Sequence, residues 1–279
     1  MTSAAFLYGL VLLSAIAHAT WNAMMKSAGD RLLTMIMIRC VGLVIGLAAL
    51  PFVDWPDAAS WKWLAATSLV QFAYYALLVR SYGVGDMSVV YPLSRGLAPV
   101  LTTVAAFLFA REDLGGSQIA AVTLISLGIM ILSLRSGASG LAVGLALATG
   151  MTVAAYSFLG GMGVRAAGTV LGFQACLEIV NGSVMLGLGL LTRPRAFVSH
   201  VRRHPGLGVM AGLMSVVGFV AYLIAAKSLP LGPVTALRET SVIFGAILGT
   251  LVLKEGFGLR RITAATMVVV GIGLLAVLR

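Results

Sequence analysis

The fold is decided by two apolar segments: PLSRGLAPVLTTVAAFLFARE at residues 92–112 and TALRETSVIFGAILGTLVLKE at residues 235–255. A shift of 143 positions superimposes an early arginine and a closing basic–acidic pair in the two segments: Arg95 on Arg238, Arg111 on Lys254, and Glu112 on Glu255. Arginine is rare inside an apolar run, because its charge is costly to expose to lipid. Its recurrence in register predicts that the chain consists of two related halves.

The composition places these halves in a membrane. Hydrophobic residues make up 60% of the 279 residues and charged residues only 10%, with a mean hydropathy of +1.04. A soluble domain carries about 25% charged residues, so this chain cannot cover itself with a polar surface. We therefore expect the lipid bilayer to be its main solvent.

The charge and the cysteines exclude other classes of partner. The net charge of +10 comes mostly from residues between apolar runs, where basic side chains contact lipid headgroups rather than nucleic acid. Cys40 and Cys176 lie inside apolar runs, and the sequence has no metal-ligand spacing. We therefore predict no nucleic-acid partner, no metal site and no cofactor.

Apolar runs long enough to cross a bilayer recur about ten times, since a helix needs about 20 residues to span a core of about 30 Å. They lie near residues 4–25, 34–53, 60–81, 88–110, 117–135, 139–161, 169–191, 205–227, 233–253 and 260–278. These runs predict an all-α integral membrane protein of two five-helix repeats, residues 1–137 and 138–279, in one membrane domain.

Five helices per half is an odd number, so the second half must enter the membrane from the opposite side. Such inverted repeats are typical of transporters, with the substrate site at the repeat interface near mid-membrane. Each early arginine lies about four helical turns from its own closing pair, so we expect it toward the face opposite that pair. A pseudo-symmetric chain of this kind is expected to function as a monomer.

The orientation stays open at this point. Loops after odd-numbered spans hold eleven of the 19 lysines and arginines, which would place these loops in the cytoplasm and both termini outside.

The fourth span supplies the first candidate site residues. Tyr91, Ser94 and Arg95 are spaced i, i+3, i+4 and share one helix face, in a segment that Pro92 and Pro99 are expected to kink. Arg95 either contacts a substrate carboxylate in a cavity or tethers two helices through an ion pair or carbonyl contact. Arg238 is its counterpart in the second half. Its neighbour Glu239 need not pair with it, because adjacent helical residues point about 100° apart.

The seventh span carries a polar stripe of Gln174, Glu178 and Asn181. A carboxyl buried in the membrane can carry a proton, which makes Glu178 a candidate for proton coupling. The alternative is an ion pair with a buried arginine, for which Arg39 is a candidate.

Further candidates lie on the first, third and sixth spans. Each could line a cavity or simply pack, and a lone histidine is more often structural than functional. These candidate substrate-binding residues are His18, Trp21 and Asn22 at i, i+3, i+4, then Gln71, Tyr74 and Tyr75, and Tyr156, which matches Trp21 at a shift of 135.

The enzyme class has little support. The sequence contains no HExxH, no GxSxG and no P-loop. A channel would need a ring of equivalent residues or a carbonyl filter from several copies. Alternating access suits two halves better, so a transporter is the favoured class and a channel or membrane enzyme the less favoured alternative.

The segments VVYPLSRGLAP (89–99) and ALRETSVIFGAILG (236–249), with fourth and ninth spans that end in Arg111-Glu112 and Lys254-Glu255, resemble the EamA-type branch of the drug/metabolite transporter superfamily. The resemblance covers the whole chain and extends to bacterial exporters of aromatic and other neutral amino acids. It implies a basket-like bundle with a central cavity that exports small metabolites across a bacterial inner membrane. It also implies cytoplasmic termini, against the charge count, and Val242 stands where the second half would match Pro99.

The favoured hypothesis is therefore an amino-acid exporter. Trp21, Tyr74 and Tyr75 are expected to stack on an apolar substrate side chain, and Arg95 or Arg238 to meet its carboxylate. A broad drug exporter, or a sugar or nucleotide-sugar transporter, is the alternative within the same family.

Overall fold

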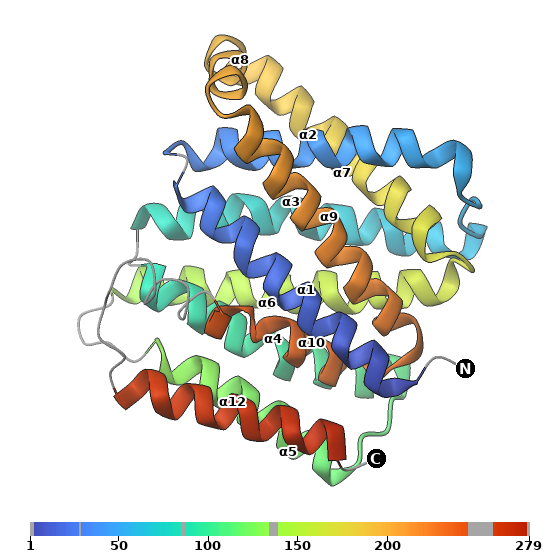
Figure 1. Cartoon of the computed structure of the whole chain (residues 1–279), viewed down its shortest axis with the longest axis vertical. Helices are drawn as coiled ribbons and strands as arrows, with labels where there is room; N and C mark the ends of the chain where they lie inside the picture. Colours follow the sequence, from blue (N-terminus) through green and yellow to red (C-terminus); the bar gives the residue numbers. More distant parts are fainter. Residues whose placement is uncertain (1–2, 28, 85–86, 134–138, 245–258, 278–279) are drawn as a thin grey trace.

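The computed structural model describes residues 3–27, 29–84, 87–133, 139–244 and 259–277. All regular elements in these ranges are helical, as the sequence predicts (Figure 1). The first half contains α1 (Ala4–Ser27), α2 (Arg31–Ala49), the short 3₁₀ turns η1 (Leu50–Phe52) and η2 (Ala58–Ser60), α3 (Trp61–Val84), α4 (Met87–Ala110) and α5 (Gly116–Ile131).

The second half contains α6 (Gly140–Ala166), α7 (Val170–Thr192), α8 (Pro194–Arg203), α9 (Pro205–Ser228), α10 (Leu231–Glu239) and α12 (Leu259–Val277). The short helix α8 lies in a connection for which the sequence predicted only a loop. It is amphipathic, because Phe197 and His200 are buried while Arg195, Arg202 and Arg203 are exposed.

Six of these helices have the length and apolar composition to cross a membrane. The corresponding segments are Ala4–Met25, Arg31–Phe52 (α2 with η1), Val89–Ala110, Gly140–Ala166, Val170–Thr192 and Pro205–Ser228. The segments Gly116–Ile131 and Ile262–Leu275 are shorter but also apolar. The ninth expected span begins with α10, and its part from residue 245 on, together with the pair Lys254–Glu255, lies outside the described residues. The total of ten spans therefore stays a prediction.

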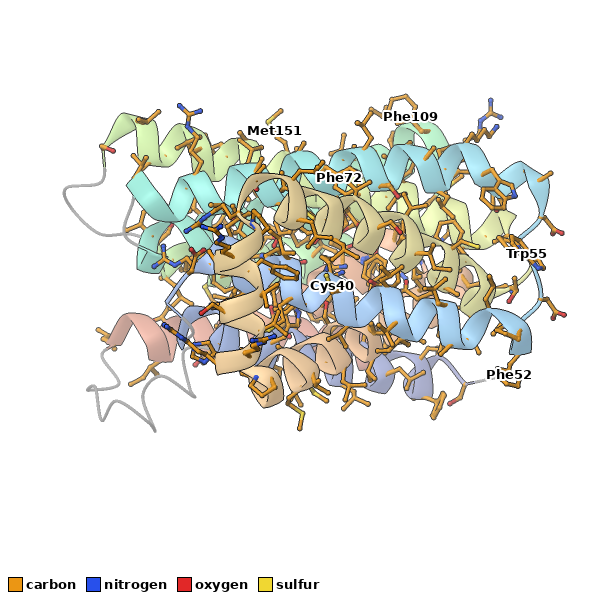
Figure 2. All side chains as sticks on the ribbon, turned by 90° about the horizontal axis from the view of Figure 1, so that it is seen from above. Cys40, Phe52, Trp55, Phe72, Phe109 and Met151 are labelled. Carbon is orange, nitrogen blue, oxygen red and sulfur yellow. The ribbon has the colours of Figure 1, made fainter. Side chains whose placement is uncertain are left out.

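The outer surface of the bundle is apolar. Phe109 and Met151 project from the sides of the helices, with 75% and 59% exposed area in turn (Figure 2). Phe52 and Trp55 are exposed at the end of the bundle that holds the α2–α3 connection, where an aromatic ring suits the membrane interface.

The helices of the two halves contact one another in an exchangeable pattern. If α1 to α5 are matched in order to α6, α7, α9, α10 and α12, then α2 packs on its own counterpart α7, α4 on α10, and α5 on α12. The contact of α1 with α9 matches that of α6 with α3, and the contact of α4 with α6 matches that of α10 with α1. Exchanging the halves therefore reproduces these contacts.

The matched helices run antiparallel. Gly189 faces Ile36, Gly182 faces Leu43, and Gly46 faces Ala175. Residue numbers therefore rise along α2 in the direction in which they fall along α7. In the same way, Thr103 of α4 contacts Gly232 near the start of α10, whereas Arg95, earlier in α4, contacts Glu239 at the end of α10. On α5 and α12, Gly128 faces Ala264 and Gly271 faces Ala121.

Both termini lie at one end of the bundle, on the right of Figure 1. The α4–α5, α6–α7 and α9–α10 turns lie at the same end, which we call the terminal face. The short helix α8 lies at the opposite end.

Candidate functional site

Two arginines share one carboxylate in the middle of the bundle. Arg95 of α4 donates from Nη1 to Oε2 of Glu239 at 3.1 Å, and Arg238 of α10 donates from Nη2 to Oε1 of Glu239 at 3.0 Å. The exposed areas of the three side chains are 2% or less. Removing such charges from water is costly unless they pair, so this cluster joins α4 firmly to α10.

This cluster decides one point that the sequence left open and corrects one expectation. Glu239 does pair with Arg238, because a long guanidinium side chain reaches back to the neighbouring carboxylate. Arg95 and Arg238 were also expected toward opposite faces. They meet instead. Each lies seven or eight residues from the first residue of its helix, which is about 11–12 Å along the axis. Because α4 and α10 begin at opposite faces of a core of about 30 Å, both arginines lie near its middle.

Tyrosine hydroxyls complete the arginine contacts. Arg95 Nη2 donates to the hydroxyl of Tyr74 at 2.7 Å, and Arg238 Nη2 donates to that of Tyr156 at 2.9 Å. Arg238 also lies over the ring of Tyr222, with its Cζ 4.5 Å from the ring centroid. Contacts of this kind stabilise a cation more when water is excluded.

A second ionic pair lies on α2 and α7. Arg39 Nη1 is 3.4 Å from Oε2 of Glu178, and its Nη2 contacts Ser215 Oγ. Gln174 Nε2 donates to Glu178 Oε1 at 2.8 Å. The alternative that paired Glu178 with Arg39 thus describes this structure, and proton coupling at Glu178 stays a prediction.

The described charges of this interior do not balance. The arginines Arg39, Arg95 and Arg238 carry three positive charges, whereas Glu178 and Glu239 carry two negative charges, which leaves one positive charge in excess. Within the described ranges, the Nε2 atom of His18 is buried without a hydrogen-bond partner. Both features suit an incoming group with acceptor oxygens.

A pocket of about 50 Å³ lies beside these groups. A single water needs roughly 10–15 Å³ by such a measure, so the pocket holds a few waters but no larger solute in this conformation. Its lining residues are Ser14, His18, Trp21, Arg39, Gln71, Tyr74, Tyr75, Tyr156, Leu177, Glu178, Ser215, Gly218, Phe219 and Arg238.

The structure brings together most of the residues predicted from sequence. His18, Trp21, Gln71, Tyr74, Tyr75, Tyr156, Glu178 and Arg238 line the pocket. The other four predicted residues lie outside its lining. Asn22 donates to the backbone carbonyl of His18 at 2.8 Å, Ser94 to that of Tyr91 at 3.0 Å, and Tyr91 lies against Arg95.

Sequence reasoning missed Ser14, Ser215, Phe219 and the shared carboxylate of Glu239. Phe219 and Ser215 lie on α9, whose glycine-rich and apolar sequence shows little polar patterning. Only Glu239, a carboxylate beside an arginine in an apolar run, carried a signal that could have identified it.

Comparison with known proteins identifies the family. The model of the EamA-like transporter family matches the chain twice, at residues 5–134 and 140–277. The chain belongs to the EamA-like transporter family. The match includes nearly the whole chain, so this protein is a multi-pass membrane transporter of small solutes rather than a member of an enzyme family.

The solved structures support the same fold. One, titled only as the crystal structure of a protein, superimposes with a TM-score of 0.74 at 15% sequence identity. The match covers 100% of this chain and 98% of the other. No curated protein sequence matches the chain significantly.

Proposed function

We propose that this EamA-family transporter exports neutral amino acids, aromatic ones among them, across a bacterial inner membrane. The observation that carries the proposal is the central pocket, where the charged side chains of α2, α7 and α10 meet aromatic walls from α1, α3, α6 and α9. It supports a solute that has a carboxylate at one end and an apolar side chain at the other.

The carboxylate is assigned to Arg238. This arginine lines the pocket, so a substrate carboxylate beside it would pair with a positive charge that the interior carboxylates leave in excess. Carboxylate and guanidinium form strong, charge-assisted hydrogen bonds. Arg95 does not line the pocket, so its role is to hold Glu239 and thereby aim Arg238. The free Nε2 of His18 provides a second polar contact.

The apolar side chain is assigned to the aromatic wall. Tyr74 and Tyr156 lie edge to face with ring centroids 5.4 Å apart, and Phe219 lies 6.4 Å from Tyr156. Trp21 and Tyr75 continue this wall. Flat rings of this kind stack favourably on an aromatic or aliphatic side chain.

The arrangement of the halves supports transport by alternating access. The antiparallel counterpart helices support a pseudo-two-fold axis in the membrane plane, and thus two inverted five-helix repeats with a central cavity. Ligand pockets usually enclose about 300–1,000 Å³. The small pocket therefore represents a closed state, and the halves separate to admit substrate. Because one chain forms the whole pocket, we infer that a monomer suffices.

Uptake into proteoliposomes tests the substrate class. Labelled phenylalanine, methionine and threonine are compared with a sugar and a cationic drug. Phenylalanine is then competed with phenylalaninamide and phenethylamine, which lack the free carboxylate. We expect free amino acids to compete with labelled phenylalanine for transport, and phenylalaninamide and phenethylamine not to compete. Transport of the sugar or the drug alone would favour the alternative substrates and overturn the amino-acid assignment.

Proton coupling through Glu178 is a separate part of the proposal. Protonation of Glu178 would release Arg39, so one proton could change which partners this arginine holds. We expect a proton flux to accompany phenylalanine transport in the wild type and to vanish in Glu178→Gln. A rate unaffected by a pH gradient in the wild type would show facilitated diffusion instead.

A further inference from the structure

The end of α4 has an unusual backbone. Arg111, the residue after the helix, has φ of 53°, in the left-handed region that residues other than glycine seldom adopt. The next amide, that of Glu112, donates to the carbonyl of Ala106 at 3.1 Å. The chain thus turns back over the helix end and directs the side chain of Glu112 toward the second half of the molecule.

The Glu112 carboxylate contacts two elements of that half. Its Oε2 accepts from the backbone N–H of Leu231, the first residue of α10, at 2.8 Å. Its Oε1 lies 2.6 Å from Nη1 of Arg165, near the end of α6. Only 12% of the Glu112 side chain and 26% of that of Arg165 are exposed, so solvent screens this pair less than an ordinary surface pair.

Arg165 extends the contact to the α9–α10 turn. It donates to the carbonyls of Ala226 at 2.9 Å and Leu229 at 2.7 Å. Lys227 in the same turn donates to the carbonyl of Gly168 at 2.6 Å. We call Glu112, Arg165 and the 226–231 turn the terminal clasp. It joins the first half to the second at the terminal face.

The clasp acts directly on the helix that carries the candidate site. Pro230 precedes α10 and provides no side-chain cap, so the Glu112 carboxylate acts as the missing cap from another element. Negative charge is favourable at this position. From Leu231 to Glu239 the helix rises about 12 Å and is buried throughout. A shift of its first turn therefore moves Arg238 and Glu239.

We propose that Glu112 is a positioning residue of the transport cycle: through the terminal clasp it holds α10 against α4 and keeps the terminal face closed. This proposal rests on transport by alternating access but not on the identity of the substrate. It gives the Arg111–Glu112 pair at the end of the fourth span a mechanical role. When the terminal face opens, Glu112 must release Leu231 and Arg165.

The test measures access to the pocket from the terminal face. The reporter is Ser14→Cys, a pocket residue, in a background with Cys40→Ala and Cys176→Ala. A membrane-impermeant thiol reagent is added on the side that bears the termini. Glu112→Ala should raise the rate of reporter modification about tenfold, the equivalent of one charge-assisted hydrogen bond. Glu112→Gln, which keeps an acceptor for Leu231, should have a smaller effect.

The matched control is Asp113→Asn, the neighbouring exposed carboxylate, which should leave the modification rate unchanged. If Glu112→Ala does not fold, Arg165→Gln tests the same clasp and should also raise the rate. A Glu112→Ala or Arg165→Gln rate equal to that of the parent would overturn the proposal. The assay needs no substrate. If Glu112→Ala raises the modification rate but no amino acid is taken up into proteoliposomes, only the substrate assignment is rejected.

Discussion

At the scale of residues, five charged groups in the described part of the interior depend on one another. Glu239 is the carboxylate on which two of the three buried arginines converge, whereas Glu178 serves one. Removing one partner of a buried ion pair costs about 3–5 kcal/mol, because the charge left behind has no compensation. The shared carboxylate should therefore matter more to stability than any other acidic residue described.

We predict that Glu239→Gln lowers the free energy of unfolding by at least about 3 kcal/mol. The control is Arg193→Gln, which breaks the pair with Asp30 at 2.7 Å, where the two side chains are 47% and 29% exposed. An exposed pair contributes about 0–1 kcal/mol. Unfolding in mixed micelles checks both variants. Equal losses would show that Glu239 is not needed to compensate the arginines.

The residue scale also shows what the sequence could predict. A buried carboxyl and a buried arginine each require a partner, so the pair of Arg39 with Glu178 was a foreseeable candidate. The convergence of Arg95 and Arg238 was not, because it depends on where α4 and α10 cross. Helical geometry separates the Cβ atoms of Arg238 and Glu239, but it does not limit where their long side chains end.

At the scale of elements, the contact of α2 with α7 relies on missing side chains. A Cβ on Gly182 would lie 2.5 Å from Cβ of Leu43 and 2.6 Å from the carbonyl oxygen of Arg39. We predict that Gly182→Ala destabilises the protein by about 1–3 kcal/mol, as overpacking does. Gly187→Ala on the same helix, with open space around its Cβ, should be neutral. A neutral Gly182→Ala in unfolding measurements would contradict this packing.

The docking of α8 is expected to depend on pH. Burial lowers the pKa of His200, and His204 lowers it further, while Nε2 of His200 lies 2.9 Å from Oγ1 of Thr34 on α2. The unfolded form then binds more protons below about pH 6.5. Stability is therefore lost as the pH falls from about 6.5. Asp30 contributes nothing in this window, because burial raises its pKa but the Leu33 amide and Arg193 lower it more, leaving it below the usual value.

Hydrogen exchange of the α8 amides at pH 7.5 and 5.5 measures this effect. Exchange should accelerate at the lower pH in the wild type and much less in His200→Gln, which keeps a donor for Thr34. The same acceleration in both proteins would assign the pH effect to other groups.

Helix ends were predictable where proline, glycine and charge interrupt long apolar runs. The helix α8 was missed because Pro194 and its arginines resemble a loop. The identity of its buried face depends on contact with α2, which lies far away in sequence.

At the scale of the whole molecule, the two halves were predictable from the repeated arginine, and the family model matches twice along the chain. The shape of the pocket was not, because it depends on side chains from several helices of both halves. The contacts between the halves suggest a cross-link that would hold the protein in the closed state, so that its effect on transport can be measured. At the terminal face, a Cβ on Gly232 of α10 would lie 3.1 Å from Cβ of Thr103 on α4.

We predict that the double variant Thr103→Cys/Gly232→Cys forms a disulfide and stops transport. A disulfide needs Cβ atoms about 3.8 Å apart, so a small relaxation suffices. The bond would hold α4 of one half to α10 of the other and prevent the terminal face from opening. Transport by the oxidised protein, with Cys40→Ala and Cys176→Ala, should return after reduction. Each single-cysteine variant should be unaffected by oxidation. Because alternating access requires these halves to separate at each face in turn, full transport by the cross-linked protein would require another contact between the halves to open.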